Sequence, residues 1–157
     1  MIIDIKKLDN TAVIPTRGSE YAAGYDLYSN EDVAEILPGE TKLVGVGISM
    51  AIPDNFAGFI YARSGLASKQ GLRPANCVGV VDSDYRGEIK VALHNDSNLI
   101  RAVNKGDRIA QLVIAPFLAV NFNEVDELND TKRGEGGFGS TGINEKEEYE
   151  QLTLFNI

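Results

Sequence analysis

Several residue types that build protein sites are scarce in this sequence. Its 157 residues include one cysteine, one histidine and no tryptophan. A single cysteine excludes a disulfide within the chain and points to a reducing compartment. With one histidine and one cysteine, a metal site of these ligand types within one chain is nearly excluded.

Long apolar segments are also lacking. No apolar run approaches the roughly 20 residues of a membrane-spanning helix. The N-terminus, MIIDIKKLDN, lacks the apolar core of a signal peptide. We therefore expect a soluble protein of the cytoplasm that does not bind membranes.

Positive charge is outnumbered by negative charge. There are 15 lysines and arginines against 23 aspartates and glutamates, which gives a formal net charge of -8 and a pI of about 4.6. This balance disfavours direct binding of nucleic acid through a broad basic face. It leaves open a phosphorylated small molecule, because a few arginines and a metal ion can reverse the field locally.

Short strands dominate the predicted secondary structure. Segments rich in β-branched residues alternate with the turn sequences LPGE, IPDN, DYRG and NKGD. The predicted strands include residues 41–52, 57–62, 88–95 and 108–122. A helical turn or two is expected only at residues 64–71, with Ser64 as its N-cap. The chain, 43% hydrophobic, is predicted to form one all-β domain, either a barrel or a sandwich.

The segment near the C-terminus has a different character. Residues 133–142 read RGEGGFGSTG, in which five of ten residues are glycine, and an acidic stretch follows. We expect everything after Thr131 to form a mobile arm. In this arm Phe138 could cover a flat ring, and three polar side chains could bind phosphate. These three are Arg133, Ser140 and Thr141. The alternative is a flexible tail.

Asp82 follows directly after CVGVV (77–81), which has the pattern of a buried strand. A carboxylate at a strand end could act as a general base that orients a water for attack. Tyr85 follows three residues later, where its ring could stack on a sugar or a base. The alternative is that DSDYRG is only a polar β-turn with an aspartate at its start.

Arg63 and Ser64 lie where a predicted strand ends and the predicted helix begins. Backbone N–H groups, a hydroxyl and a guanidinium in that place suit an anion. The alternative is a surface arginine beside an ordinary N-cap.

Two further polar residues fall within apolar stretches. Asp26 in AAGYDLYS (22–29) would need a cation or metal as a partner if it pointed inward, and otherwise it is exposed on an edge strand. Gln111 in GDRIAQL (106–112) could face a ligand, or it could be an exposed strand residue.

Five segments in order carry a family resemblance. They are AAGYDLYS (22–29), ARSGLA (62–67), NCVGVVDSDYRGE (76–88), GDRIAQL (106–112) and RGEGGFGSTG (133–142). Together they resemble the five ordered motifs of the trimeric dUTP diphosphatase (dUTPase) family, over about residues 15–142. The second motif departs from the family pattern, because Ala62 stands where proline is frequent. We expect this to loosen the motif slightly without loss of function.

This resemblance implies a fold and an activity. The fold would be a jelly-roll-like β-barrel, with a homotrimer whose three active sites lie between subunits. The reaction would be hydrolysis of dUTP to dUMP and pyrophosphate, by attack of water on the α-phosphorus. The glycine-rich arm would come from a third chain and close over the substrate as a lid.

The resemblance also implies residue roles at the nucleoside. Asp82 would orient and activate the attacking water, and Tyr85 would pack under the deoxyribose and exclude a 2′-hydroxyl. Asn76 and the strand backbone around Gly79 would bind the edge of uracil, and Phe138 would stack over it.

A second set of roles concerns the phosphates and the cofactor, Mg²⁺. Asp26 would meet Mg²⁺ through water, with the triphosphate as the direct ligand. The implied phosphate-binding residues are Arg63, Ser64, Gly65, Gln111, Arg133, Ser140 and Thr141.

Three parts of the chain are predicted. Residues 1–131 would form the nucleotide-hydrolase domain, 132–142 the lid, and 143–157 an acidic tail. The tail contains QLTLF, which resembles the peptide by which bacterial replication and repair proteins dock on the DNA polymerase sliding clamp. Its polar anchor and apolar plugs would be Gln151, Leu152, Leu154 and Phe155. The alternative is that this peptide packs on a neighbouring subunit.

Two rival functions remain at this stage. A dCTP deaminase has a related fold but needs a glutamate at the base-binding strand, where this chain has Asp82 and Tyr85. A regulator that binds dUTP without hydrolysing it is the other rival, and the five intact motifs argue against lost catalysis.

Overall fold

The computed structural model describes residues 1–140. The chain divides into two compact units, Met1–Ala119 and Val120–Ile157, and the first contains all the strands and the helix of the described residues. In chain order these elements are β1 (Asp4–Lys7), β2 (Thr16–Arg17), β3 (Tyr25–Tyr28), β4 (Val33–Ile36), β5 (Thr41–Gly45), β6 (Ile48–Ala51), β7 (Phe56–Tyr61), α1 (Ser64–Gln70), β8 (Leu72–Pro74), β9 (Gly79–Val81), β10 (Lys90–Asn95), β11 (Arg101–Asn104) and β12 (Arg108–Pro116).

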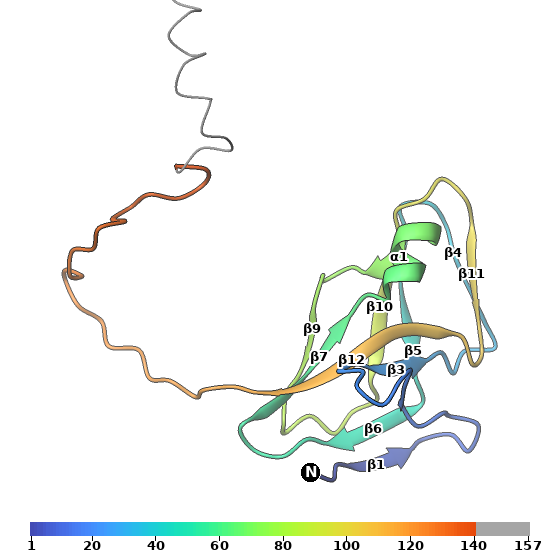
Figure 1. Ribbon diagram of the computed structural model, residues 1–157. Coiled ribbons are helices and arrows are strands. Elements are labelled where there is room, and N and C mark those ends of the chain that lie inside the picture. Colours follow the sequence, from blue (N-terminus) through green and yellow to red (C-terminus); the bar gives the residue numbers. More distant parts are fainter. Residues whose placement is uncertain (141–157) are drawn as a thin grey trace, which may run out of the picture. The chain divides into compact units, whose positions relative to one another are not determined.

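The strands of the first unit form four antiparallel sheets. The largest has the order β2-β3-β12-β7-β9, and a second has the order β5-β10-β8 (Figure 1). Two further pairs, β1 with β6 and β4 with β11, complete the set. The prediction of an all-β fold with one short helix is confirmed.

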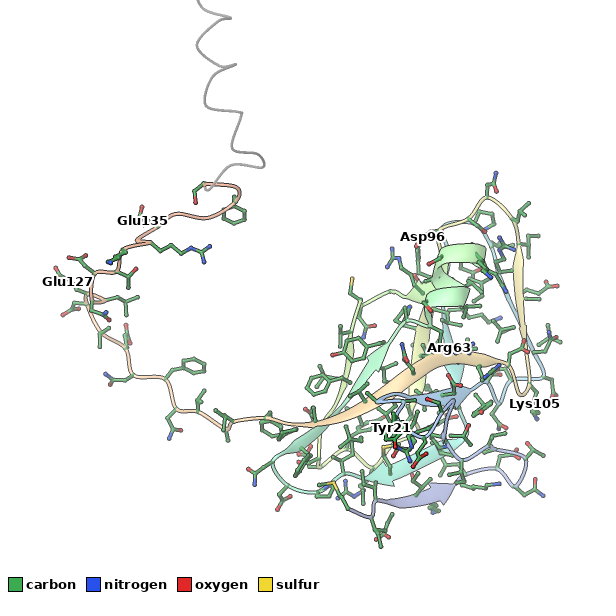
Figure 2. All side chains as sticks on the ribbon, viewed as in Figure 1. Tyr21, Arg63, Asp96, Lys105, Glu127 and Glu135 are labelled. Atoms are coloured by element: carbon green, nitrogen blue, oxygen red, sulfur yellow. The ribbon has the colours of Figure 1, made fainter. Side chains whose placement is uncertain are left out.

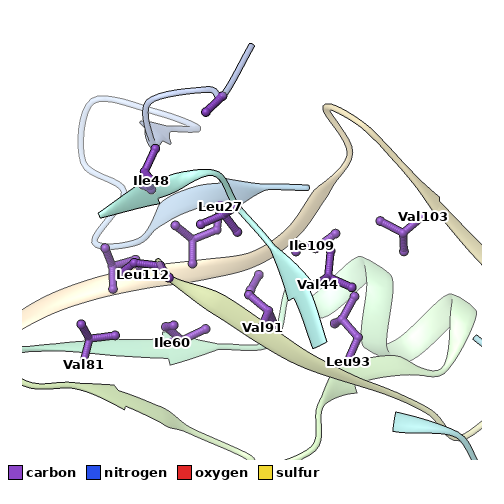
Figure 3. Packing of buried hydrophobic residues seen from close by; sticks show 14 of the residues in the cluster. Leu27, Val44, Ile48, Ile60, Val81, Val91, Leu93, Val103, Ile109 and Leu112 are labelled. Atoms are coloured by element: carbon purple, nitrogen blue, oxygen red, sulfur yellow. The ribbon is translucent and has the colours of Figure 1, made fainter. Parts of the chain in front are cut away.

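One apolar cluster joins the two larger sheets. Leu27, Ile60 and Leu112 come from the five-stranded sheet, and Val44 and Leu93 come from the three-stranded one (Figure 3). Their side chains are nearly inaccessible to solvent. Because burying such a side chain contributes about 1.5–3 kcal/mol, this cluster holds the sheets together.

Two predicted strands differ from the observed ones. The segment 41–52 divides into β5 and β6 at Val46 and Gly47. Gly47 has φ 69, which favours glycine. The segment 108–122 is a strand only as far as Pro116, which has no N–H to continue a ladder.

The helix α1 begins one residue earlier than a Ser64 N-cap predicts. Its N-cap is Arg63, whose backbone is extended and whose carbonyl accepts the N–H of Ala67 at 2.9 Å. Ser64 is therefore the first helical residue, and the prediction of Ser64 as N-cap is wrong. The helix ends at Gly71, which has φ 70 and supplies the left-handed cap.

The prediction of a buried strand at 77–81 is only partly right. Strand β9 covers Gly79–Val81, and its end residues are buried. Val80 between them is 60% exposed and Cys77 is exposed, because β9 lies at the edge of the sheet with one face uncovered within the chain.

Residues 120–140 contain turns but neither helix nor strand. Their backbone hydrogen bonds are local, such as those from Gly136 to Arg133 at 3.0 Å and from Ser140 to Gly137 at 3.0 Å. The predicted roles of Thr141 and of the QLTLF peptide concern residues outside the described part of the chain.

Candidate functional site

A polar pocket of about 470 Å³ lies beside the start of α1. Five of its lining residues are predicted site residues, namely Asp26, Arg63, Ser64, Gly65 and Gln111. The other residues that line it are Gly18, Ala22, Gly24, Leu66, Lys69, Gln70 and Arg108. The pocket therefore gathers the second and fourth sequence motifs, and part of the first, around one space.

Asp26 is the centre of the charge arrangement in this pocket. Its side chain is 13% exposed. Arg63 Nε donates to Asp26 Oδ1 at 2.8 Å, and Arg108 Nη1 donates to Asp26 Oδ2 at 3.3 Å. Arg63 also donates through Nη1 to the carbonyl of Arg108 at 3.1 Å. The carboxylate thus has the partners that an inward position requires, and it fixes the orientation of Arg63 (labelled in Figure 2).

Arg108 was missed by the sequence analysis. Alternation along a strand would place Arg108 and Gln111 on opposite faces. The pairing of β12 with β3 changes register between Arg108 and Ala110, and this bulge brings Arg108 to the pocket as well. Lys69, near the end of α1, is the third cation that lines the pocket, and it was not predicted either. In the sequence, Arg108 could have been noticed only as the arginine of the GDRIAQL motif.

Gln111 is held in place by the backbone of the neighbouring strand. Its Nε2 donates to the carbonyl of Ala62 at 2.9 Å. A Cβ on Gly24 would lie 2.6 Å from Gln111 Oε1, so a side chain at position 24 would displace the glutamine. Ser64 and Gly65 are exposed at the first turn of α1, and the Ser64 hydroxyl is not used as a cap.

A second group of predicted residues lies around β9. Asp82 and Asn76 are exposed, and Gly79 is buried against Ile60. Tyr85, which is 46% exposed, donates its backbone N–H to the carbonyl of Asp82 at 3.2 Å. The predicted polar turn with aspartate at its start is therefore present.

The structure does not bring these two groups together within one chain. Strand β9 pairs with β7 so that Val81 lies opposite Gly58. Arg63 lies five residues beyond Gly58, and Asp82 continues in the other direction. At about 3.3 Å per residue, this register separates Asp82 from Arg63 by up to about 20 Å along the strand direction, and no residue of the β9 group lines the pocket.

The glycine-rich arm presents its aromatic residue to solvent. Phe138 is fully exposed and has φ 49, and Ser140 is exposed. Arg133 donates through Nε to the carbonyl of Gly136 at 2.8 Å. The described part of the arm contains no contact that assigns these residues to a ligand.

The described residues do not build a metal site alone. They contain no group of three or more His, Cys, Asp or Glu side chains placed to hold a metal ion. Asp26 offers one carboxylate, already shared by two guanidinium groups. This donor set fits an ion such as Mg²⁺ only if the ion keeps waters and takes its direct ligands from a substrate.

Within residues 1–140, no helix is long and apolar enough to cross a membrane.

Comparison with known proteins decides the family. The model of the family described as dUTPase matches residues 10–142. The chain belongs to the dUTPase family. The dUTPase prediction from the five motifs is confirmed, and with it the assignment to the hydrolases.

Relatives of high identity come from a bacterium and a virus. The chain is 52% identical over 142 residues to the deoxyuridine 5′-triphosphate nucleotidohydrolase of Nautilia profundicola, covering 90% of this chain and 99% of that protein. It is 49% identical over 140 residues to the enzyme of the same name from Paramecium bursaria Chlorella virus 1, covering 88% and 96%.

Solved dUTPase structures share the fold. A mutant of the Staphylococcus bacteriophage 80alpha dUTPase with dUpNHpp superposes with a TM-score of 0.83 at 28% identity, covering 90% of this chain and 99% of that one. A mutant dUTPase of S. aureus phage phi11, whose structure is described as revealing the molecular details for the coordination of a structural Mg(II) ion, gives a TM-score of 0.73 at 26% identity, covering 81% of this chain and 98% of that one. The jelly-roll-like prediction is confirmed by this likeness.

Proposed function

We propose that this dUTPase-family chain hydrolyses dUTP to dUMP and pyrophosphate. One observation carries the proposal: the pocket beside α1 collects three cations and only one carboxylate in a protein of net charge -8. A local excess of positive charge suits a triphosphate. The product dUMP would supply thymidylate synthesis, and removal of dUTP would limit uracil in DNA.

The phosphate chain would bind in this pocket. Arg63 would present its guanidinium, oriented by Asp26, and Ser64 and Gly65 would present a hydroxyl and backbone N–H groups from the first turn of α1. Gln111 would add an amide, and Arg133 with Ser140 and Thr141 of the arm would reach the outer phosphates. These donors would stabilise charge on the leaving pyrophosphate.

The nucleoside would bind at β9 and its turn. The backbone around Gly79, with Asn76, would pair with the uracil edge, while Phe138 would cover the base. Tyr85 would pack under the deoxyribose. Asp82 would take a proton from a water, whose oxygen forms the new bond to the α-phosphorus while the bond to pyrophosphate breaks.

Mg²⁺ is the cofactor that we propose for this reaction. Bound to the triphosphate, it would neutralise charge on the phosphate oxygens. Asp26 would contact it through water, which fits a single carboxylate that is already ion-paired.

A homotrimer with shared active sites would bring the phosphate-binding pocket beside α1 together with the nucleoside-binding residues around β9. A base acts within about 3 Å of its water, and that water within about 3.5 Å of phosphorus. Asp82 must therefore approach the α-phosphorus of a triphosphate held by Arg63, although the register of β7 and β9 separates the two residues by up to about 20 Å along the strand direction. A second copy that supplies Asp82 to the pocket of the first would satisfy both requirements.

The test is product analysis by mass spectrometry. Wild-type protein with dUTP and Mg²⁺ is expected to give dUMP and pyrophosphate, and Asp82→Asn is expected to lose this activity by at least about 100-fold. Release of ammonia from dCTP would instead indicate a deaminase. Tight dUTP binding without any product would indicate a sensor.

Regulation by nucleotide binding is a second candidate role. Phage 80alpha dUTPase, similar in structure to this chain, is described as controlling the transfer of virulence genes by a G protein-like mechanism. For this chain the hypothesis is tested by partner capture with and without dUTP.

Docking on a sliding clamp through Gln151, Leu152, Leu154 and Phe155 remains a hypothesis from sequence alone. A clamp pull-down comparing the wild-type chain with Gln151→Ala plus Phe155→Ala tests it. Equal retention of both proteins would reject it.

A further inference from the structure

The turn between β9 and β10 holds Asp82 and Tyr85 in a fixed relation. The Tyr85 N–H donates to the Asp82 carbonyl at 3.2 Å. Arg86 Nη1 donates to the carbonyls of Ser83 and Tyr85, at 2.6 and 3.0 Å. These hydrogen bonds all lie within the turn. They therefore hold Asp82, the proposed base, and Tyr85, which is proposed to pack under the sugar, in a fixed relative position.

A second set of contacts fixes the Tyr85 ring. The Tyr85 hydroxyl donates to the carbonyl of Glu88 at 3.0 Å. Glu88 in turn accepts the backbone N–H of Gly47 through Oε1 at 3.0 Å. The next residue, Ile89, is 2% exposed and donates its N–H to Ile48 at 2.9 Å. The ring is therefore tethered to the buried connection between β5 and β6.

Gly87 leaves free the space that this ring occupies. A Cβ added to Gly87 would overlap the Tyr85 hydroxyl oxygen and would lie 2.6 Å from Cζ and 3.0 Å from Cε2. Cβ atoms essentially never approach another atom below 3.0 Å. Gly87 does not have a positive φ, so alanine could adopt its backbone conformation. The ring would have to move instead.

We propose that Gly87 is a specificity-determining positioning residue. Because Gly87 carries no side chain, the Tyr85 ring lies against the turn and its hydroxyl donates to the Glu88 carbonyl. The ring therefore has a fixed position from which to contact the sugar. A methyl group at position 87 displaces the ring and breaks this tether. The displaced Tyr85 ring then no longer excludes a 2′-hydroxyl from the site. The inference rests on the proposed function, in which Tyr85 contacts the deoxyribose.

The test measures kcat/KM for dUTP and for UTP in the wild-type protein and in Gly87→Ala. We expect Gly87→Ala to lower the ratio of the two values at least about tenfold, because selectivity depends on contacts in the transition state. Gly39→Ala is the control. Gly39 has φ 74 and nothing within 4 Å of its Cβ position, so the substitution strains the backbone without displacing a side chain. Its ratio should stay unchanged.

Each outcome is decisive. An unchanged ratio in a folded Gly87→Ala protein overturns the inference. If Gly87→Ala does not fold, Tyr85→Phe decides, since it keeps Gly87 and the ring but lacks the bond to Glu88: a lower ratio supports the inference and an unchanged ratio overturns it. A wild-type protein that hydrolyses neither nucleotide contradicts the proposed function instead.

Discussion

Asp26 illustrates how much of a residue's role the sequence can predict. The cost of an unpaired inward carboxylate predicted that Asp26 would need a cation or a metal if buried. Its partners are Arg63 and Arg108, which lie 37 and 82 positions away. The pairing of β12 with β3 on one side and with β7 on the other brings these residues together, so the need for a partner was predictable and the identity of the partners was not.

A substitution at Asp26 tests both of its proposed contacts. Asp26→Asn removes the charge that strengthens both hydrogen bonds and leaves one oxygen to accept them, and charged hydrogen bonds are worth about 1.5–3 kcal/mol each, so kcat/KM for dUTP should fall at least about tenfold. The Mg²⁺ concentration for half-maximal rate should also rise. Asp32→Asn is a matched control, because Asp32 is 93% exposed and its one ion pair within residues 1–140 is with Lys105. An unchanged Mg²⁺ requirement would contradict the proposed contact of Asp26 with Mg²⁺ and leave only its ion pairs with Arg63 and Arg108.

At the scale of elements, periodicity predicted the strands but not their interruptions. Branched residues and turn sequences correctly indicated most of β5, β6, β7, β10 and β12. The bulge at Arg108 and the end of β12 at Pro116 depend on what each strand pairs with, and a single sequence does not specify these partners. The N-cap error at Ser64 has a different origin, because the extended backbone of Arg63 already accepts the first helical N–H, that of Ala67, at 2.9 Å.

The end of β10 offers a stability prediction at this scale. Asn95 is fully buried, and its Nδ2 donates to the carbonyls of Ile36 at 2.9 Å and Leu99 at 2.8 Å. Asn95→Ala removes the donor to both carbonyls and leaves Leu99 only its bond from the Ser97 hydroxyl, so the free energy of unfolding should fall by about 2–5 kcal/mol. Urea titration measures this loss. Asn98→Ala, an exposed asparagine nearby, should change it by less than about 0.5 kcal/mol.

At the scale of the whole molecule, the two halves of the proposed site give a prediction about assembly. The family resemblance predicted sites between subunits, and the antiparallel pairing of β7 with β9 supplies a physical reason. It places Asp82 and Arg63 toward opposite ends of the same strand pair. A chain that keeps both motifs intact would still lack a complete site on its own.

Mixing two inactive variants tests this arrangement. Asp82→Asn and Arg63→Ala should each be nearly inactive alone. After unfolding and refolding together, a site is intact where an Arg63→Ala chain supplies Asp82 and an Asp82→Asn chain supplies Arg63. Random assembly of equal amounts makes about a quarter of the sites complete, so about a quarter of wild-type activity should return. The same variants refolded separately and then combined without subunit exchange should remain inactive. If co-refolding also restores nothing, the complete site lies within one chain, and the turn at Asp82 must move toward the pocket when dUTP binds.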